Sequence, residues 1–294
     1  MKTSEEYNLL KASDIPYCDD EVTFYSLVPL QPKGHKAPLF IVHGADYNVS
    51  KFNNLAKNLD ADQPVYALQA RGIKGDVRPH ETVEEMASSY ISEIKYINQE
   101  KPFALAGFSF GGIIAFEMVK QLKDSEINVK GLFLFDSYVY PTYYCSDPSK
   151  KKVVSILYNI GQLSFMGLNM FSSIANFKRR VYLLKLKFQG LLLKLKYGRE
   201  QQYQLQFSRS SKIDELHSLA YIRYHIIPQN IRVNLFWSSK KLYFTHDYNY
   251  LGWKNISLQG INKHILPGNH SEMFLSPVVE EFGKKLQILL DNED

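Results

Sequence analysis

One short stretch, Phe103–Met118, constrains the fold of this chain more than any other. An apolar run, Phe103–Ala106, meets Gly-x-Ser-x-Gly centred on Ser109, and apolar residues at helical spacing follow at once. This is the sequence context of a nucleophile elbow, a sharp strand-turn-helix connection that exposes a nucleophilic side chain. Gly107 and Gly111 flank the serine at positions where side chains would collide in such a turn. The stretch therefore predicts a strand that ends in an exposed Ser109 beneath the start of a helix.

Strands and helices are expected to alternate on both sides of this turn. The expected strands are Val22–Leu27, Leu39–His43, Val65–Leu68, the elbow strand from Phe103, Val129–Phe135, Ile231–Trp237 and Gly260–Leu266. Pro29 is expected to close the first of them. The expected helices are Ser50–Leu59 with Ser50 as its cap, Thr82–Asn98 with a capping box, the elbow helix and Pro277–Leu290. The apolar run Leu39–His43 is typical of a strand buried on both faces of a mostly parallel sheet. The alternation predicts an α/β fold with a mostly parallel central sheet flanked by helices.

Composition excludes several classes of protein. With 294 residues, 45% hydrophobic and 22% charged, the chain has the composition of a globular protein rather than a disordered or fibrous one. The net charge of +5 is modest and no nucleic-acid motif occurs, so no nucleic-acid partner is expected. The two cysteines lack disulfide or metal-ligand spacing, and the N-terminus lacks a secretory signal. We expect a cytoplasmic protein without a metal site.

The pattern divides the chain into four segments. Residues 1–20 have no clear period and are expected to be a tail or linker stub. Residues 21–145 and 230–294 carry the alternating pattern of the core, and residues 146–229 interrupt it with helix-like sequence. We expect this insertion to be helical.

Ser109 requires an adjacent base and an acid that orients the base. In folds with this type of turn the chain order is serine, acid, histidine. Asp136 follows the strand after the elbow, and His270 lies in a loop after the last strand, so both should lie at the carboxyl edge of the sheet with Ser109. Asp247, which follows a later strand, is the alternative acid.

Position along the chain separates His270 from the other histidines. His43 ends an early strand and is expected to shape the loop that follows, and His264 lies inside an expected strand. The oxyanion hole should come from two backbone N–H groups, that of Phe110 directly after the nucleophile and that of Ala45 in the loop after the early strand.

Five motifs occur in order along the chain: Ile41–Gly44, Leu68–Gly72, Gly107–Gly112, Leu134–Tyr138 and Pro267–Met273. Together they resemble those of the thioesterase domains of nonribosomal peptide and polyketide synthases. The resemblance runs from about Tyr25 to the C-terminus, apart from the insertion. It implies the α/β-hydrolase fold with a helical lid formed by the insertion.

The resemblance also implies a reaction. An acyl, polyketidyl or peptidyl chain would arrive as a thioester on the phosphopantetheine arm of a carrier protein and pass to Ser109, with His270 as base and Asp136 as acid. Hydrolysis or cyclisation would then release it, with no further cofactor. The carrier would act in trans or belong to a parent synthase. No carrier-like segment precedes the hydrolase region, so either a free-standing enzyme or a domain of a longer chain is expected.

The insertion contains an unusual uncharged stretch, Val153–Phe177, bounded by basic residues. Its asparagines, glutamine and glycines make it a poor membrane span, and we expect lid helices that line a channel for a hydrophobic acyl chain. Apolar and lysine residues at helical spacing over Val181–Lys196 then predict a basic amphipathic helix. Three interpretations remain open for it: a solvated face, a docking surface for an acidic carrier protein, and contact with an anionic membrane, which is the least favoured.

Two enzyme functions fit these patterns. The first is a serine thioesterase that acts on carrier-bound chains through an acyl-enzyme intermediate. The alternative is an esterase or lipase that acts on lipid oxygen esters or acyl-CoA, with the basic insertion as its membrane anchor. A catalytically idle binding module is disfavoured because Ser109, Asp136 and His270 are all present.

Overall fold

The structure, a computed structural model, describes residues 24–73, 77–98, 101–123, 127–145, 147–170, 208–241 and 244–292, together with single positions between 174 and 185. Statements below about the chain refer to these residues.

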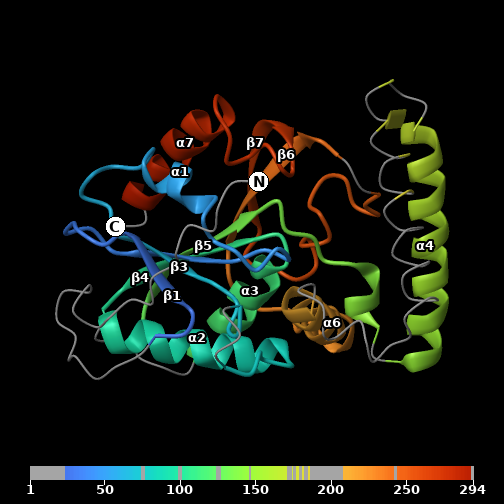
Figure 1. Cartoon of the computed structure of the whole chain (residues 1–294), viewed down its shortest axis with the longest axis horizontal. Coiled ribbons are helices and arrows are strands. Elements are labelled where there is room, and N and C mark those ends of the chain that lie inside the picture. Colours follow the sequence, from blue (N-terminus) through green and yellow to red (C-terminus); the bar gives the residue numbers. More distant parts are fainter. Residues whose placement is uncertain are drawn as a thin grey trace.

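A seven-stranded sheet forms the centre of the molecule (Figure 1). Its strands are β1 Leu27–Gln31, β2 Leu39–Val42, β3 Val65–Leu68, β4 Phe103–Phe108, β5 Val129–Phe135, β6 Val233–Lys240 and β7 Ile261–Asn269. They lie in the order β1-β3-β2-β4-β5-β6-β7, and every neighbouring pair is parallel except β1 and β3. The mostly parallel α/β fold predicted from the sequence is confirmed.

Helices cover both faces of the sheet (Figure 1). The short helix α1, Phe52–Ala56, and the C-terminal helix α7, Val278–Asn292, pack on one face, while α2, Val83–Asn98, and α3, Gly111–Leu122, pack on the other. Each pair buries its apolar side chains against the sheet, which explains why the central strands are apolar on both faces.

Several element boundaries differ from the predictions. The first strand begins at Leu27 and continues through Pro29, whereas a strand over Val22–Leu27 that Pro29 closes was expected. A proline is tolerated because β1 is the edge strand, and the pairing with β3 is irregular there. Helix α1 is shorter than predicted, and Ser50 does not cap it. Strand β7 continues past Leu266 as far as Asn269, the residue before His270.

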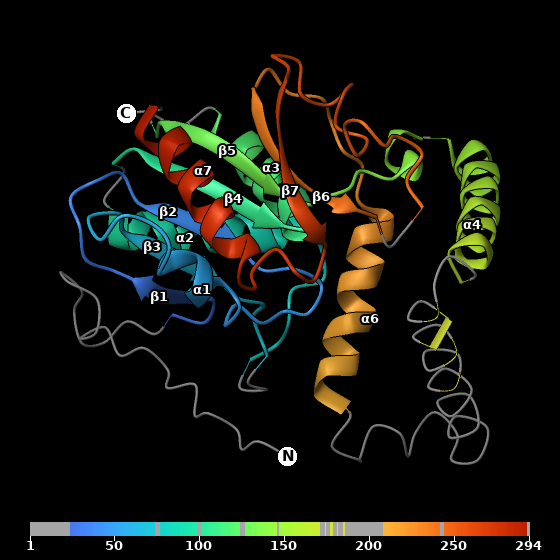
Figure 2. The same cartoon turned by 90° about the horizontal axis from the view of Figure 1, so that it is seen from above.

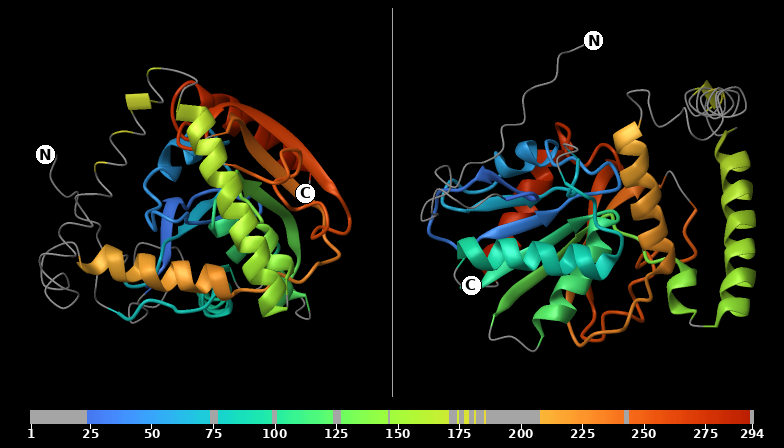
Figure 3. Two further views of the ribbon diagram at one scale, coloured as in Figure 1. Left: turned by 90° about the vertical axis from the view of Figure 1, so that its right-hand side faces the viewer. Right: turned by 60° about the horizontal axis from the view of Figure 1, so that its bottom comes forward.

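The described part of the insertion between β5 and β6 includes the 3₁₀ turn η2, Pro141–Tyr144, and the helices α4, Pro148–Met170, and α6, Ser208–Arg223. Both helices lie to one side of the sheet, with α6 nearer to it than α4 (Figures 2 and 3). Residues Val153–Met170 of the uncharged stretch belong to α4. The predicted basic helix over Val181–Lys196 falls almost entirely outside the described residues.

Candidate active site

Ser109 occupies the sharp turn between β4 and α3. Its φ is +54°, a left-handed conformation that is rare for residues other than glycine, and its N–H donates to the Phe135 carbonyl at 2.9 Å. The turn leaves no room beside it: a Cβ atom on Gly107 would lie 2.2 Å from the Gly111 carbonyl oxygen, and one on Gly111 would lie 2.2 Å from the His43 carbonyl oxygen. Two glycines therefore permit the strained turn that presents Ser109 at the sheet edge.

Asp136 and His270 meet at the same edge. Asp136 directly follows β5, with a φ of +43°, and His270 directly follows β7. The distance between His270 Nδ1 and Asp136 Oδ2 is 2.8 Å. An ionised carboxylate only accepts hydrogen bonds, so Nδ1 carries the proton and donates it, which leaves Nε2 as an acceptor. Residues 134 positions apart in sequence thus orient one imidazole.

The Asp136 carboxylate is fully buried and receives several further donors. The Ser238 N–H and the Lys241 ammonium each donate to Oδ1 at 3.0 Å, while the hydroxyls of Ser238 and Tyr138 donate to Oδ2 at 2.7 and 3.2 Å. Burial by itself would raise the pKa of Asp136, but the hydrogen bond with His270 and the charge of Lys241 hold it well below its ordinary value. The carboxylate therefore stays ionised.

Lys241 and Ser238 were not singled out in the sequence. The Lys241 side chain is only 7% exposed, and its ammonium lies 4.3 Å from the centre of the Trp237 ring. Burial lowers the pKa of Lys241, and the Asp136 carboxylate opposes that shift. Both residues lie at the end of β6. This position indicates a role beside Asp136 only once β6 is known to pair with β5.

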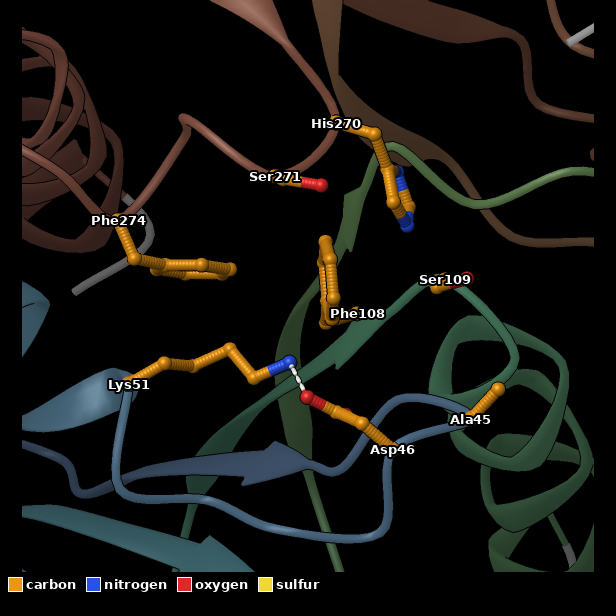
Figure 4. A pocket seen from close by; sticks show the side chains of 8 residues that line it. All are labelled: Ala45, Asp46, Lys51, Phe108, Ser109, His270, Ser271 and Phe274. Carbon is orange, nitrogen blue, oxygen red and sulfur yellow. Dashed lines mark hydrogen bonds and ion pairs between the residues drawn. The ribbon is translucent and has the colours of Figure 1, made fainter. Parts of the chain in front are cut away.

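Figure 4 shows the His270 imidazole pointing toward Ser109 across the mouth of a cavity. The cavity measures about 400 Å³, and Ala45, Ser271 and Phe274 also line it. The Phe108 ring stacks on His270 with centroids 4.5 Å apart, so the residue before Ser109 helps to hold the imidazole. Lys51 and Asp46 form an ion pair at this cavity. The sequence-predicted residues Ser109, Asp136 and His270 are therefore brought together.

The two residues predicted to supply the oxyanion donors, Ala45 and Phe110, also lie beside Ser109. Ala45 lines the cavity beside Ser109, and Phe110 is the residue from which α3 starts. Within the described part of the chain, no backbone carbonyl accepts a hydrogen bond from the N–H of either residue.

The competing candidates have other partners. Asp247 organises its own turn, because its carboxylate accepts from the N–H groups of Asn249, Tyr250 and Gly252 at 3.0 to 3.2 Å. His43 is fully buried below the loop, where its ring nitrogens lie 2.6 Å from the Gly44 carbonyl and 2.9 Å from the Tyr90 hydroxyl. Burial lowers the pKa of His43 to about 4, so this imidazole is neutral.

A second cavity, of about 560 Å³, shares Ala45 and Ser109 with the first. It lies between the core and the inserted helices, and its walls are mainly aromatic. The rings that line it belong to Tyr47, Phe110, Tyr138, Tyr140, Tyr158, His217 and Tyr221. A channel suited to a hydrophobic chain was expected, whereas this cavity combines aromatic rings with hydroxyl and amide groups.

The helices of the insertion reach this cavity with both polar and apolar side chains, Tyr221 and Ile222 of α6 among the latter. Ser155, Tyr158 and Asn159 of α4 line it, together with His217 of α6. The Tyr158 hydroxyl donates to the Phe244 carbonyl at 3.0 Å, and this contact anchors α4 to the core. His217 was not separated from the other histidines in the sequence, since its position depends on how α6 packs.

Comparison with known proteins places the chain in a family. The family model described as Thioesterase domain matches residues 37–286, which is most of the chain. The chain belongs to the thioesterase-domain family. Proteins of known sequence that resemble this thioesterase domain include "Atromentin synthetase invA2" of Paxillus involutus, 43% identical over 108 residues, or 36% of this chain and 11% of that protein. "Nonribosomal peptide synthetase apvA" of Aspergillus terreus is 42% identical over 110 residues, or 37% of this chain and 12% of that protein.

Solved structures share the fold. The thioesterase domain of NocB, in covalent complex with a fluorophosphonate nocardicin G analog, has a TM-score of 0.59 at 19% identity and covers 90% of this chain and 99% of its own. A four-domain nonribosomal peptide synthetase bound to AMP and glycine has a TM-score of 0.65 at 20% identity, over 92% of this chain and 20% of its own. At such identities the likeness establishes the α/β-hydrolase fold alone.

The thioesterase domain spans only about a tenth of the length of the curated relatives it matches. Among the helices that the structure describes, none has the length and apolar content needed to cross a bilayer.

Proposed function

We propose that this thioesterase domain releases an acyl, polyketidyl or peptidyl chain from a phosphopantetheine thioester through an acyl-enzyme on Ser109. The observation that carries the proposal is the hydrogen bond between His270 and the buried, ionised Asp136 at the cavity that Ser109 lines. The hydrogen bond from Nδ1 orients the imidazole so that Nε2 is the nitrogen that takes the proton of the serine hydroxyl.

In the first half-reaction, the Ser109 hydroxyl gives its proton to His270 Nε2 while its oxygen attacks the thioester carbonyl carbon. The backbone N–H groups of Ala45 and Phe110 donate to the oxyanion that forms. Collapse of the tetrahedral intermediate breaks the carbon–sulfur bond, and the imidazolium returns the proton to the departing pantetheine thiol. The acyl chain is left as an ester on Ser109.

In the second half-reaction, water or a nucleophile within the chain gives a proton to His270 and attacks the ester carbonyl. The ester carbon–oxygen bond breaks, and the Ser109 oxygen recovers the proton. Hydrolysis and cyclisation differ only in the source of the nucleophile. Asp136 stabilises the imidazolium in both half-reactions without itself taking a proton.

Lys241 and Ser238 act as positioning residues for Asp136. Because the carboxylate is buried, its charge and its orientation depend on the groups that donate to it.

A carrier protein is the proposed partner. The named relatives are multidomain synthetases of which this chain matches one part, which supports a thioester delivered on a carrier, either from a parent synthase or in trans. The helices of the insertion, α4 and α6, act as a lid that roofs the second cavity. Membership of the thioesterase-domain family favours thioester cleavage over the hydrolysis of lipid oxygen esters.

A fluorophosphonate probe tests the proposal. Wild-type protein should be labelled on Ser109, and Ser109→Ala should lose both labelling and turnover of acyl-pantetheine thioesters. Thioesters and oxygen esters of the same acyl chain are then compared by kcat/KM. A strong preference for the oxygen ester, or turnover that persists in Ser109→Ala, would refute the proposal.

A further inference from the structure

We infer that the second cavity binds the acyl chain, and that this chain is uncharged, aromatic and equipped with a hydrogen-bonding group such as a hydroxyl or a carbonyl. The inference rests on the proposed function, because it assigns the substrate class of the same Ser109 site. It follows from three features of the described residues: the aromatic walls of the cavity, the absence of charged side chains on them, and one histidine whose ring nitrogens have no hydrogen-bond partner there.

The walls favour an aromatic guest. Rings from three separate parts of the fold face the cavity: Tyr47 after β2, Tyr138 and Tyr140 after β5, and Tyr158 and Tyr221 from the inserted helices. They already contact one another edge to face, as in Tyr140 with Tyr158 at 4.9 Å and Tyr140 with Tyr221 at 5.4 Å. A planar ring can join such an arrangement in the same geometry. Among the described lining residues Ile222 is the only branched aliphatic side chain, so a flexible alkyl chain gains less.

The lining carries no ionised side chain among the described residues. A carboxylate or ammonium on the acyl chain would lose its hydration without gaining an opposite charge, which is a large cost. The charges of the site lie elsewhere: Lys51 and Asp46 belong to the first cavity, and Lys241 is engaged by Asp136. The second cavity therefore selects an uncharged chain.

His217 supplies the polar contact. Its side chain is 3% exposed, and neither ring nitrogen has a hydrogen-bond partner in the described part of the chain. Burial lowers the pKa of His217 to about 3, so the ring is neutral and offers one donor and one acceptor. Buried polar groups are ordinarily paired, and an orphan in a ligand cavity points to a partner on the ligand.

The two residues that line both cavities determine how the substrate is oriented between them. Ser109 and Ala45 line both, so the thioester carbonyl lies where they meet. With the acyl chain in the aromatic cavity, the pantetheine arm leaves through the first cavity, past Phe274 and the Lys51–Asp46 pair. In this arrangement the charged Lys51 and Asp46 lie beside the polar pantetheine arm and away from the acyl chain.

A panel of pantetheine thioesters tests the inference on the wild-type protein. The acyl groups are octanoyl, 3-phenylpropanoyl, its three monohydroxylated isomers and its 4-carboxylate. We expect kcat/KM for phenylpropanoyl to exceed that for octanoyl about tenfold, the best hydroxylated isomer to add a further factor of roughly ten, and the carboxylate to be the poorest. Octanoyl as the best substrate, or equal rates throughout, would overturn the inference.

Two outcomes separate this inference from the proposed function. If Ser109 is labelled by fluorophosphonate and is acylated by octanoyl best, the proposed function stands and the inference fails. If Ser109 is neither labelled nor acylated by any thioester, the proposed function itself fails.

Two substitutions locate the effect. His217→Phe should abolish the roughly tenfold preference for the hydroxylated chain while phenylpropanoyl is still accepted, and the exposed His225→Phe should leave that preference intact. Ser155→Lys on α4 adds a cation to the cavity wall without disturbing the core and should raise kcat/KM for the carboxylate about tenfold. Ser164→Lys, on the opposite side of the same helix, is its control. Equal effects of test and control variants would reject the assignment.

Discussion

Two histidines line the two cavities that meet at Ser109, and their surroundings are opposite. His270 faces a carboxylate that is itself held by Ser238, Tyr138 and Lys241. His217 faces aromatic rings and has no hydrogen-bond partner in the described part of the chain. The Asp136 carboxylate orients the first imidazole, whereas the second is neutral and is surrounded by aromatic rings. We propose that His270 transfers protons at the sheet edge and that His217 binds the ligand beneath the insertion.

The largest effect should come from removing the support of His270. Asp136→Asn keeps the shape of the side chain but cannot stabilise the imidazolium, so we expect kcat to fall by about 10⁴-fold. His217→Phe, in contrast, should change kcat for phenylpropanoyl-pantetheine by less than about tenfold. The measurement is single-turnover acylation of both variants, with thermal unfolding as a check on folding. Similar losses in the two variants would contradict the division of roles.

A smaller effect should follow from changing the cation behind Asp136. In Lys241→Met the buried carboxylate loses a partner 3.0 Å away, so we expect a loss of about 3 kcal/mol in the free energy of unfolding. The acid limb of kcat/KM should also move to higher pH, because the charge of Lys241 helps to lower the pKa of Asp136 and its loss lets the carboxylate be protonated at a higher pH. Lys241→Arg keeps the charge and should retain the wild-type limb. A purely structural lysine would alter stability in Lys241→Met and leave the pH profile unmoved.

The smallest effect concerns the unpartnered imidazole. The pKa of His217 lies near 3 in the folded chain and near 6.5 in the unfolded chain, so the unfolded chain binds the proton first as the pH falls. Its contribution to stability is complete above pH 6.5 and is lost as the pH falls toward 3. Between pH 7 and pH 5 this amounts to roughly 2 kcal/mol. His217→Phe should reduce the pH dependence of urea unfolding by that amount, and an unchanged dependence would show that the imidazole is not held neutral.

Most of the fold could be predicted because its signals are local. The predicted strands Val65–Leu68 and Val129–Phe135 coincide with β3 and β5, and Gly107 and Gly111 mark the elbow. Ser109, Asp136 and His270 each follow a strand of one parallel sheet, so their common edge follows from the alternation alone. The first strand was misplaced because Pro29 reads as a terminator until β1 is known to be an edge strand.

The residues around this constellation could not be predicted, since their roles depend on packing between distant elements. Lys241 acquires its role only because β6 lies beside β5, and His217 only because α6 packs against the loop after β2. A lysine after a strand and a histidine on a helix carry no such information in the sequence. The Val153–Phe177 stretch likewise suggested an apolar channel, although the face of α4 that reaches the cavity presents Ser155 and Asn159.

Intact-mass analysis after rapid mixing with 3-(hydroxyphenyl)propanoyl-pantetheine tests the central claim most directly. The account predicts an adduct with the mass of the acyl group, located on the peptide that contains Ser109, which decays as free acid or cyclised product appears. Ser109→Ala should show no adduct. Turnover without any adduct on Ser109, or acylation at another residue such as Cys145, would contradict it.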